Sequence, residues 1–430
     1  MRKPNILMLG WEFPPVINGG LGIACHDLSV ALTEFANVNM IIPKAIHGAY
    51  HDKLNVIGLN NIDVNSLKDI SRKGEYNSFE QLYEVPVNLE PYYSEDDYKR
   101  EGKAGYITEV IIAGKKFNVF DIDNLYGGDI MEKVRQFANI ATKLSENIDF
   151  DVIHCHDWMT MIAGMAIKAK SGRPLVMHIH SLEVDRSGPE SKGWLYGLEK
   201  LGMETADLLF PVSHFTGENI VKYYGISREK IVPVHNGIRP VDAFKTLSPY
   251  NEKTVLFVGR LTKQKGPEFF LDIASKVLKH RPDVRFVVAG AGEHFKKMLF
   301  ESSYSNIGNR FHLTGFINQQ QLRKLLSFTD VYLMPSVSEP FGLSAVEAAQ
   351  FQVPCVISKQ SGVAEVLPGS LKFDFWDIDK AADYVLNLLN DQVLNQKVIN
   401  DANENLKNIC WTQSAKKVVD QYRNFKIYQN

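Results

Sequence analysis

Two glutamates eight positions apart are the first residues whose types and spacing indicate chemistry. Glu339 and Glu347 lie in the stretch Ser336–Ala348 (SVSEPFGLSAVEA), which follows the short apolar run Val331–Met334. The apolar run predicts a buried strand, and the alanine-rich residues that come next predict a helix. The first turn of that helix would offer backbone N–H groups to an anion such as phosphate. Two carboxylates beside a helix start therefore suit a ligand that carries both phosphates and hydroxyl groups.

A basic, glycine-bounded loop is the second chemical element. Gly259–Gly266 (GRLTKQKG) follows a predicted strand and opens a predicted helix, so Arg260 and Lys265 can converge on one helix N-terminus. Arginine binds phosphate oxygens in a bidentate manner, and lysine supplies a mobile point charge. Lone basic residues usually solvate a surface loop, but their place at a sheet edge favours a phosphate site. The loop lacks the spacing of a P-loop.

The elements that must position these residues alternate between strands and helices. Ile6–Leu9 predicts a strand, a loop rich in glycine and proline follows to Gly22, and a helix and a second strand (Val38–Ile42) come next. This order opens a doubly wound parallel sheet. Residues 44 to about 107 are polar and rich in tyrosine, which indicates an insertion that shapes a binding surface. The same alternation of strands and helices restarts near residue 254.

The length of 430 residues exceeds the size at which a single core stops growing, so we expect two domains. The predicted fold is α/β, with two Rossmann-like doubly wound sheets that face each other across a cleft. We expect an N-terminal domain over residues 1–240 and a C-terminal domain over residues 241–411. The final helix, about 412–430, would rejoin the first domain. His235–Glu252 would be the linker.

Composition excludes several classes of protein. The formal net charge of −2 argues against a protein whose whole surface binds nucleic acid or anionic membranes. Four scattered cysteines fit a reducing compartment and no disulfide framework or zinc site. No stretch has the length of a membrane span or of a signal-peptide core. We expect a cytoplasmic protein with at most peripheral membrane association; the oligomeric state stays open.

The motifs, taken together and in order, resemble the GT-B retaining glycosyltransferases. The specific likeness is to family four and to the bacterial and archaeal glycogen (starch) synthases. It spans nearly the whole chain and includes five further stretches: Pro15–Gly22, Asp151–Trp158, Val234–Gly237, Leu313–Phe316 and Ser361–Glu365. The resemblance implies transfer of a sugar, with glucose as the best guess, from a UDP- or ADP-sugar to a saccharide or glycan acceptor. It also implies retention of anomeric configuration and no required cofactor or metal.

The resemblance assigns roles to individual residues. Arg260 and Lys265 would hold the diphosphate, Glu347 would bind the ribose, and Glu339 would contact the transferred sugar. His180 would lie near the donor sugar, and Asp123 would line the acceptor side. The remaining donor-binding positions would contact the diphosphate, the base or the sugar, partly through backbone atoms: Gly19, Gly20, Gly315, Phe316, Ile317, Phe341, Gly342 and Leu343.

Two positions depart from the glycogen synthase pattern. Those enzymes carry lysine two residues before the paired glycines, where this chain has Ile17, and usually histidine where it has Met159. Both departures weaken an assignment to glycogen elongation and leave sugar transfer intact.

Three alternatives remain at this point. A metal-dependent hydrolase would use histidines at the ends of two predicted strands: His154, His156, His178 and His180. Arg260 and Lys265 argue against it, because they supply the charge neutralisation that a metal would provide. A non-catalytic sugar- or nucleotide-binding protein and a nucleotide-sugar epimerase could use the same fold.

Overall fold

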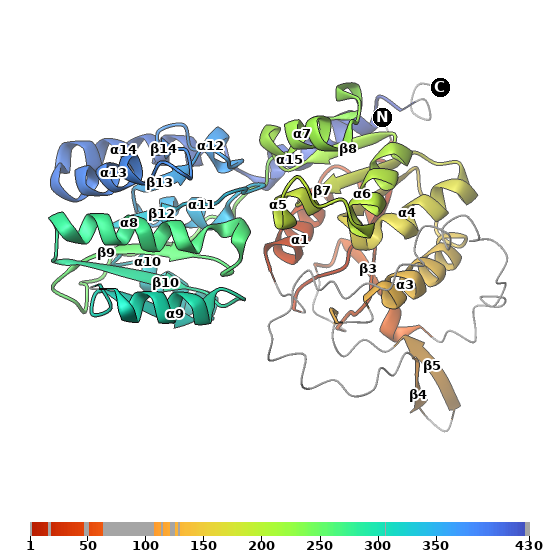
Figure 1. Cartoon of the computed structure of the whole chain (residues 1–430). Helices are drawn as coiled ribbons and strands as arrows, with labels where there is room; N and C mark the ends of the chain where they lie inside the picture. The colour runs from red at the N-terminus through yellow and green to blue at the C-terminus, as the bar shows by residue number, and fades with distance from the viewer. Residues whose placement is uncertain are drawn as a thin grey trace.

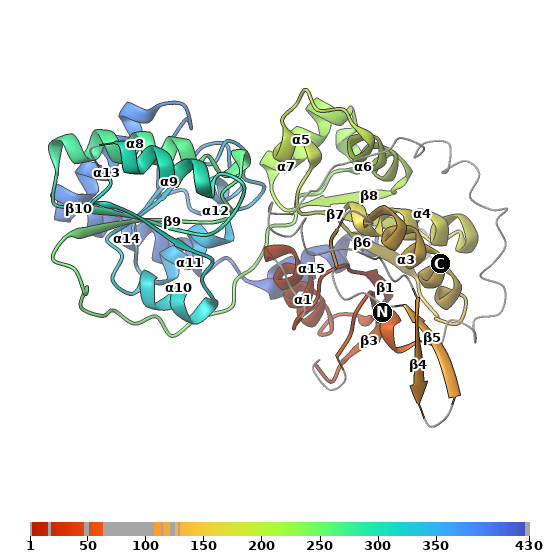
Figure 2. The same ribbon diagram turned by 60° about the horizontal axis from the view of Figure 1, so that its bottom comes forward.

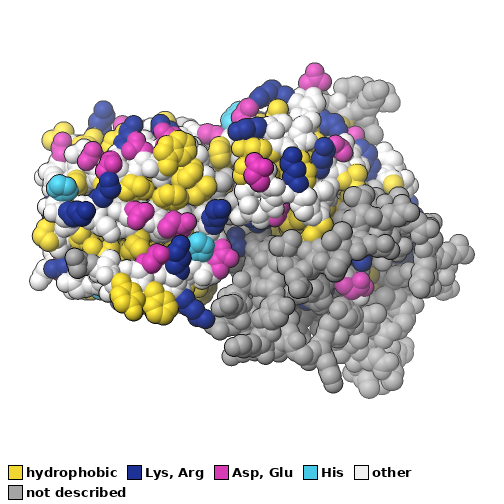
Figure 3. All heavy atoms as spheres, in the orientation of Figure 1, with side chains coloured by type: hydrophobic (Ala, Val, Ile, Leu, Met, Phe, Trp, Pro, Cys, Tyr) yellow, Lys and Arg dark blue, Asp and Glu magenta, His cyan; other side chains and the backbone are white. Residues whose placement is uncertain are grey.

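The computed structural model describes residues 2–15, 19–46, 51–62, 107–112, 115–120, 125–127, 130–305 and 307–425. They form two α/β domains that lie side by side, each built on a six-stranded parallel sheet (Figure 1). On the visible face of the C-terminal domain, basic and acidic side chains are interspersed (Figure 3).

The N-terminal sheet is covered by helices on both faces. Its strands, in spatial order, are β3 (Leu54–Gly58), β2 (Asn37–Ile42), β1 (Asn5–Leu9), β6 (Val152–His156), β7 (Leu175–Ile179) and β8 (Leu208–Pro211). Its helices are α1 (Gly20–Leu32), α3 (Ile130–Ser145), α4 (Trp158–Ser171), α5 (Glu183–Ser187), α6 (Trp194–Thr205) and α7 (His214–Asn219), with short turns η1 (Leu59–Asn61), η3 (Ile220–Tyr224) and η4 (Arg228–Lys230). Helices α3, α4 and α6 share one apolar core, and α1 lies in the core of the opposite face. A separate antiparallel hairpin joins β4 (Ile107–Ile112) to β5 (Lys115–Phe120).

The C-terminal sheet repeats this plan. Its spatial order is β11 (Phe311–Gly315), β10 (Val284–Ala289), β9 (Lys253–Val258), β12 (Val331–Met334), β13 (Cys355–Ser358) and β14 (Leu371–Phe373). Its helices are η5 (Lys263–Lys265), α8 (Pro267–His280), α9 (Phe295–Tyr304), α10 (Gln319–Leu326), α11 (Leu343–Gln350), α12 (Val363–Val366), α13 (Ile378–Asn390) and α14 (Gln392–Leu406). Helices α8, α9 and α13 cover one face, and α10, α11 and α12 cover the other.

Both sheets have the strand order of a doubly wound fold, which confirms the predicted fold class. In each sheet all strands are parallel, and the direction in which successive strands are added reverses at the centre, between β1 and β6 and between β9 and β12. Ligands of such sheets bind outside the carboxyl ends of the strands at this reversal. The loops after these four strands are therefore where a site is expected.

The last helix, α15 (Trp411–Tyr422), packs on the N-terminal domain (Figure 2). Its residues Ala415, Val418 and Tyr422 are fully buried in the same apolar core as α1. The chain passes between the domains twice, once near Ile238 and once near Cys410. These two segments lie together, because Ile238 and Cys410 form a parallel bridge. A Cβ atom on Gly237 would lie 2.2 Å from the backbone nitrogen of Trp411, so only glycine fits at this contact.

The structure corrects three details of the expected elements. Strand β3 lies within the stretch interpreted as an insertion, and its place at the sheet edge explains why its pattern is weak. Residues 231–234 form no strand: Val232 and Val234 donate backbone N–H groups to the carbonyls of Leu209 and Pro211 in β8, but Pro211 has no N–H to donate in return, so Ile231 makes only an isolated bridge. The first helix begins at Gly20, three residues before the predicted start at Ile23. Within the insertion, residues 63–106 lie outside the described residues.

Candidate active site

Lys265 and Glu339 form an ion pair at the carboxyl edge of the C-terminal sheet. Lys265 ends the turn η5 after β9, and Glu339 lies in the loop after β12. The backbone around the glutamate is held on both sides: its N–H donates to the Gln360 carbonyl at 2.9 Å, and its carbonyl accepts from Gly362 at 2.9 Å. Glu339 therefore occupies a fixed position rather than a loose loop.

Close backbone packing shapes the loop that carries Arg260 and Lys265. Gly290 has a φ of +156°, and a Cβ atom there would lie 1.8 Å from the Gly259 carbonyl oxygen. Gly266, with a φ of +64°, is the N-cap of α8, and a Cβ atom on it would lie 2.3 Å from the Pro335 oxygen. These contacts require glycine and bring the loops after β9, β10 and β12 together. Arg260 is exposed on this loop.

Two helix N-termini, one from each domain, meet across the cleft. Helix α11 begins at Leu343 after Gly342, and α1 begins at Gly20 after Gly19. A Cβ atom on Gly20 would lie 3.5 Å from Leu343 Cδ1. Neither helix has an acidic residue in its first turn or a side-chain cap among the described residues. Backbone N–H groups and the positive ends of two helix dipoles therefore favour an anion here.

The cleft between the domains has a volume of about 810 Å³. Five of the predicted donor-binding residues line it: Gly19, Phe316, Ile317, Leu343 and Glu347. Gly315, at the end of β11, has a φ of +72° and turns the chain into this wall. Phe341 is buried and its ring lies 6.2 Å from that of His235, so only its backbone is suited to the predicted ligand contact.

Glu347 is held in the cleft wall by a neighbour that sequence reasoning missed. Its Oε1 accepts a hydrogen bond from Gln319 Nε2 at 3.0 Å. Burial raises the pKa of Glu347, while Gln319 and the positive charge of Arg323 act in the opposite direction. Gln319 and Arg323 lie one turn apart on α10, and both line the cleft. Nothing in the sequence around them marks them as site residues.

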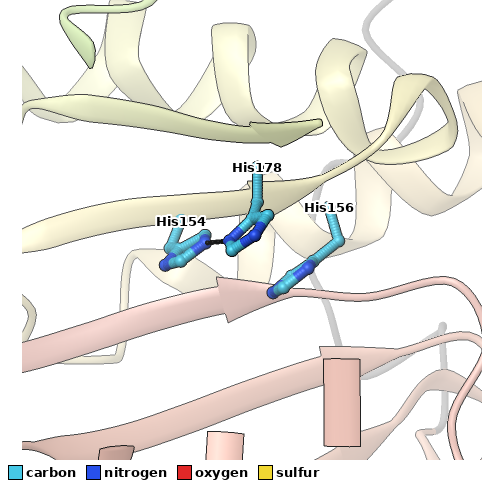
Figure 4. Close-up of side chains that lie close together, drawn as sticks. All are labelled: His154, His156 and His178. Carbon is cyan, nitrogen blue, oxygen red and sulfur yellow. Dashed lines mark hydrogen bonds between the residues drawn. The ribbon is translucent and has the colours of Figure 1, made fainter. Parts of the chain in front are cut away.

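His180 belongs to a group of four histidines at the ends of β6 and β7; Figure 4 shows the other three. The rings are nearly parallel: His154 and His156 are 4.8 Å apart at 8°, and His178 and His180 are 4.7 Å apart at 14°. His154 Nε2 lies 3.2 Å from His178 Nδ1, and His156 Nδ1 lies 2.9 Å from His180 Nε2. Burial lowers the pKa of His154 and of His180 to about 3. The pKa values of His156 and His178 also fall well below the usual range, chiefly through burial, so the group is uncharged.

The arrangement of these rings is unsuited to the metal site of the hydrolase hypothesis. His154, His156 and His178 do bring ring nitrogens together. However, the ring of His156 is stacked on both others, at interplanar angles of 8° and 12°. A metal ion binds the in-plane lone pair of each imidazole, and lone pairs in stacked, parallel rings do not converge on one point. The geometry instead favours hydrogen bonds within the group.

Asp157 holds the backbone of His180 through a hydrogen bond, and sequence reasoning did not include it among the site residues. Its carboxylate accepts the His180 backbone N–H at 2.6 Å, and its side chain is almost fully buried. Its backbone has φ 56° and ψ 179°, a conformation that is nearly confined to glycine. Burial raises the pKa of Asp157 to about 7, although the hydrogen bond from His180 opposes this shift. A sequence shows no signal of such backbone strain.

Two hydrogen bonds join the Glu339 loop to the N-terminal domain. Ser338, next to Glu339, donates a hydrogen bond to Asp185 of α5 at 2.6 Å. Ser213 of the N-terminal domain donates to the Pro340 carbonyl at 2.6 Å. Five of the predicted residues thus line the cleft, and two others, Lys265 and Glu339, pair with each other at the edge of the C-terminal sheet. Asp123 lies outside the described residues.

Comparison with known proteins agrees with this geometry. Residues 5–258 match the family described as starch synthase catalytic domain, and residues 239–405 match glycosyl transferases group 1. An uncharacterized glycosyltransferase of Methanocaldococcus jannaschii is 26% identical over 97% of this chain and 98% of its own length. The glycogen synthase of Mycobacterium tuberculosis is 25% identical over 84% of this chain and 80% of its own length.

A solved structure shows the same fold at low sequence identity. The catalytic domain of starch synthase IV from Arabidopsis thaliana, bound to ADP and acarbose, superposes with a TM-score of 0.66 at 15% identity. It covers 98% of this chain and 99% of that chain. The chain therefore belongs to the family of the starch synthase catalytic domain, and it is a glycosyltransferase of the glycogen and starch synthase type with the GT-B architecture.

Proposed function

We propose that this enzyme transfers a sugar, with glucose as the best candidate, from a UDP- or ADP-sugar to a saccharide or glycan acceptor, with retention of anomeric configuration. The observation that carries the proposal is the ion pair of Lys265 and Glu339 at the carboxyl edge of the same sheet as the uncapped N-terminus of α11. Cationic groups and a helix N-terminus suit a diphosphate, and a fixed carboxylate suits sugar hydroxyl groups.

The leaving group sets the electrostatic requirement. As the bond from the anomeric carbon to the β-phosphate breaks, negative charge builds on the phosphate and the sugar becomes similar to an oxocarbenium ion. Arg260, Lys265 and the N-terminus of α11 would stabilise that charge without reorganisation. This pair of cations supplies the neutralisation, so we propose transfer without a metal.

The sugar and the nucleoside would be held by the two glutamates. Glu339 would accept hydrogen bonds from hydroxyl groups of the transferred sugar, and Glu347 would accept them from the ribose. Retention would follow from attack by the acceptor on the same face as the leaving phosphate, which would help to accept the acceptor's proton. His180 would contact the donor sugar, and Asp123 would line the acceptor side.

The acceptor and the organisation of the chain complete the proposal. A glycan acceptor is supported by the relative named glycogen synthase and by the starch synthase IV structure with acarbose, while Ile17 and Met159 depart from the glycogen synthase pattern. Residues 1–240 would form the acceptor-side domain and residues 241–411 the donor domain, with about 412–430 rejoining the first. Among the described residues no helix is long and apolar enough to span a membrane. We propose a cytoplasmic enzyme.

A panel of nucleotide-sugars tests the function. The purified chain is incubated with UDP-, ADP- and GDP-sugars, with and without maltooligosaccharide, and the released nucleotide and sugar products are identified. We expect release of UDP or ADP and an α-linked product that depends on acceptor. An isomerised sugar nucleotide would indicate an epimerase instead, and hydrolysis that needs no acceptor and is lost on chelation would indicate the metal-dependent hydrolase.

A further inference from the structure

The ring of His180 is held on one edge and one face. Its Nε2 lies 2.9 Å from His156 Nδ1. Its face is stacked on His178, with ring centroids 4.7 Å apart and planes at 14°. Its backbone N–H donates to Asp157. With Nε2 engaged, Nδ1 is the ring nitrogen that remains for a substrate.

The hydrogen bond between the two rings has two possible directions. Either His156 carries its proton on Nδ1 and donates to His180, or His180 carries its proton on Nε2 and donates to His156. The two choices differ in what they leave at the far side of His156, where Nε2 is buried without a hydrogen-bond partner among the described residues. In the first choice that nitrogen is a bare acceptor, and in the second it is a bare N–H donor.

The second choice is the less favourable. Buried N–H groups without a partner are rarer in folded proteins than acceptors without one. The first choice therefore describes the pair better: His156 Nδ1–H donates, His180 Nε2 accepts, and the proton of the neutral His180 ring is on Nδ1.

We propose that His156 is a positioning residue that fixes His180 as the Nδ1–H tautomer, so that His180 donates a hydrogen bond from Nδ1 to a hydroxyl oxygen of the transferred sugar. This assignment rests on the proposed function for its substrate, but the tautomer itself does not depend on it. His180 would then present a donor to the sugar, opposite in polarity to the acceptor that Glu339 would present.

The surroundings keep both rings neutral, as the tautomer requires. The groups that face them are His154 on β6, His178 on β7 and Asp157 at the start of α4, which itself lies near Arg186 and Glu199. A proton added to any one ring would place a charge beside the others, and burial opposes it further; accordingly the pKa of His180 lies near 3.

Nitrogen-15 spectroscopy of the histidines tests the tautomer directly. The full chain is labelled with ¹⁵N-histidine, and the ring resonances of His180 are assigned by their loss in His180→Ala. We expect a protonated Nδ1 and an unprotonated Nε2 in the wild type, and loss of this preference in His156→Leu. A wild-type His180 with its proton on Nε2 overturns the proposal, whether or not any donor sugar is turned over.

Kinetics with matched variants separate positioning from packing. His156→Asn keeps an N–H near the Nδ1 position and should retain most of the turnover number. His156→Leu should lose about 10- to 100-fold in turnover number, by analogy with residues that orient metal-binding histidines. His154→Leu disturbs the same stack, but His154 bonds Tyr422 and His178 instead of His180, and should lose less.

A double variant checks that His156 acts through His180. In the background of His180→Ala, the further change His156→Leu should have little additional effect on the turnover number. Effects that multiply, or equal losses in His156→Asn and His156→Leu, would contradict the proposal. If His156→Leu does not fold, the spectrum of the wild type and the turnover of His156→Asn still decide it. If no donor is turned over by the wild type, the proposed function fails and the spectrum alone tests the tautomer.

Discussion

The ammonium of Lys265 pairs with the carboxylate of Glu339, although the two residues lie 74 positions apart in the chain. The pair joins the loop after β9 to the loop after β12, on the two central strands of the C-terminal sheet. In the proposed reaction the two residues have different roles: the lysine binds the diphosphate and the glutamate binds the sugar. Without a donor, each holds the other in the place where its proposed ligand would bind.

Replacement of Lys265 should therefore impair catalysis far more than replacement of its neighbour Lys263. Both lie in the turn η5, but Lys263 is exposed and Lys265 pairs with Glu339. We expect Lys265→Ala to lower the turnover number on the order of 100-fold or more, by analogy with the loss of a donor that stabilises charge in a transition state. Lys263→Ala should stay close to the wild type. The rates are measured by release of nucleoside diphosphate at saturating donor.

Glu339→Ala should show a comparable loss in turnover number, because it removes the proposed contact to the sugar. Near-normal rates in both Lys265→Ala and Glu339→Ala would exclude the proposed site. Thermal melting of each variant establishes that the fold is kept.

Glu347→Gln should weaken nucleotide binding with a smaller effect on turnover. The carboxylate is proposed to accept two ribose hydroxyl groups, and a hydrogen bond to a charged group contributes about 1.5–3 kcal/mol, which corresponds to about 10- to 100-fold in affinity. Calorimetric titration with UDP and ADP measures the dissociation constants. Glu404→Gln, an exposed residue that pairs with Lys407 on the surface, is the matched control. Equal affinities in the two variants would remove Glu347 from the ribose site.

Asp157 should make the stability of the protein depend on pH. Burial raises the pKa of this carboxyl from 3.8 to about 7 in the folded state. Between these values the folded protein binds one more proton than the unfolded chain, so stability falls as pH rises through this window. In Asp157→Asn the amide oxygen can still accept the His180 N–H, but the titration is gone.

The melting temperature of Asp157→Asn, relative to the wild type, should therefore rise from about pH 4 to about pH 7 and level off above it. Scanning fluorimetry in a series of buffers measures the difference. A difference that is constant across this range would show that Asp157 has an ordinary pKa in the folded protein.

The sequence was informative where a physical rule links residue type to backbone position. Parallel strands appear as short apolar runs, and Gly266 and Gly342 mark helix starts, so both sheets and the residues at their carboxyl edges were predictable. Glu339 and Lys265 were placed by type and spacing. The partners of these residues were not predictable, because Gln319, Asp185 and Asp157 act through contacts made only in the folded chain. The hydrogen bonds among the histidines depend on strand register, which the sequence does not show.

Closure of the domains should depend on Glu365. This residue of α12 accepts the backbone N–H groups of His214 and Phe215 at 3.0 and 2.7 Å and pairs with His235 at 2.7 Å. All three partners come before Gly237 in the chain, where it passes from the N-terminal to the C-terminal domain. The carboxylate of Glu365 therefore joins the C-terminal domain to the N-terminal one. Its removal leaves two N–H groups at the start of α7 without an acceptor, which favours separation of the domains.

We expect small-angle scattering of the wild type to show a more compact particle with UDP or ADP than without. The scattering of Glu365→Ala should change less on nucleotide addition, and its turnover number should fall although nucleotide affinity is nearly kept. Glu404→Ala on α14, an exposed residue whose carboxylate pairs only with Lys407 among the described residues, should behave as the wild type. Identical compaction in Glu365→Ala and the wild type would show that this contact does not control closure.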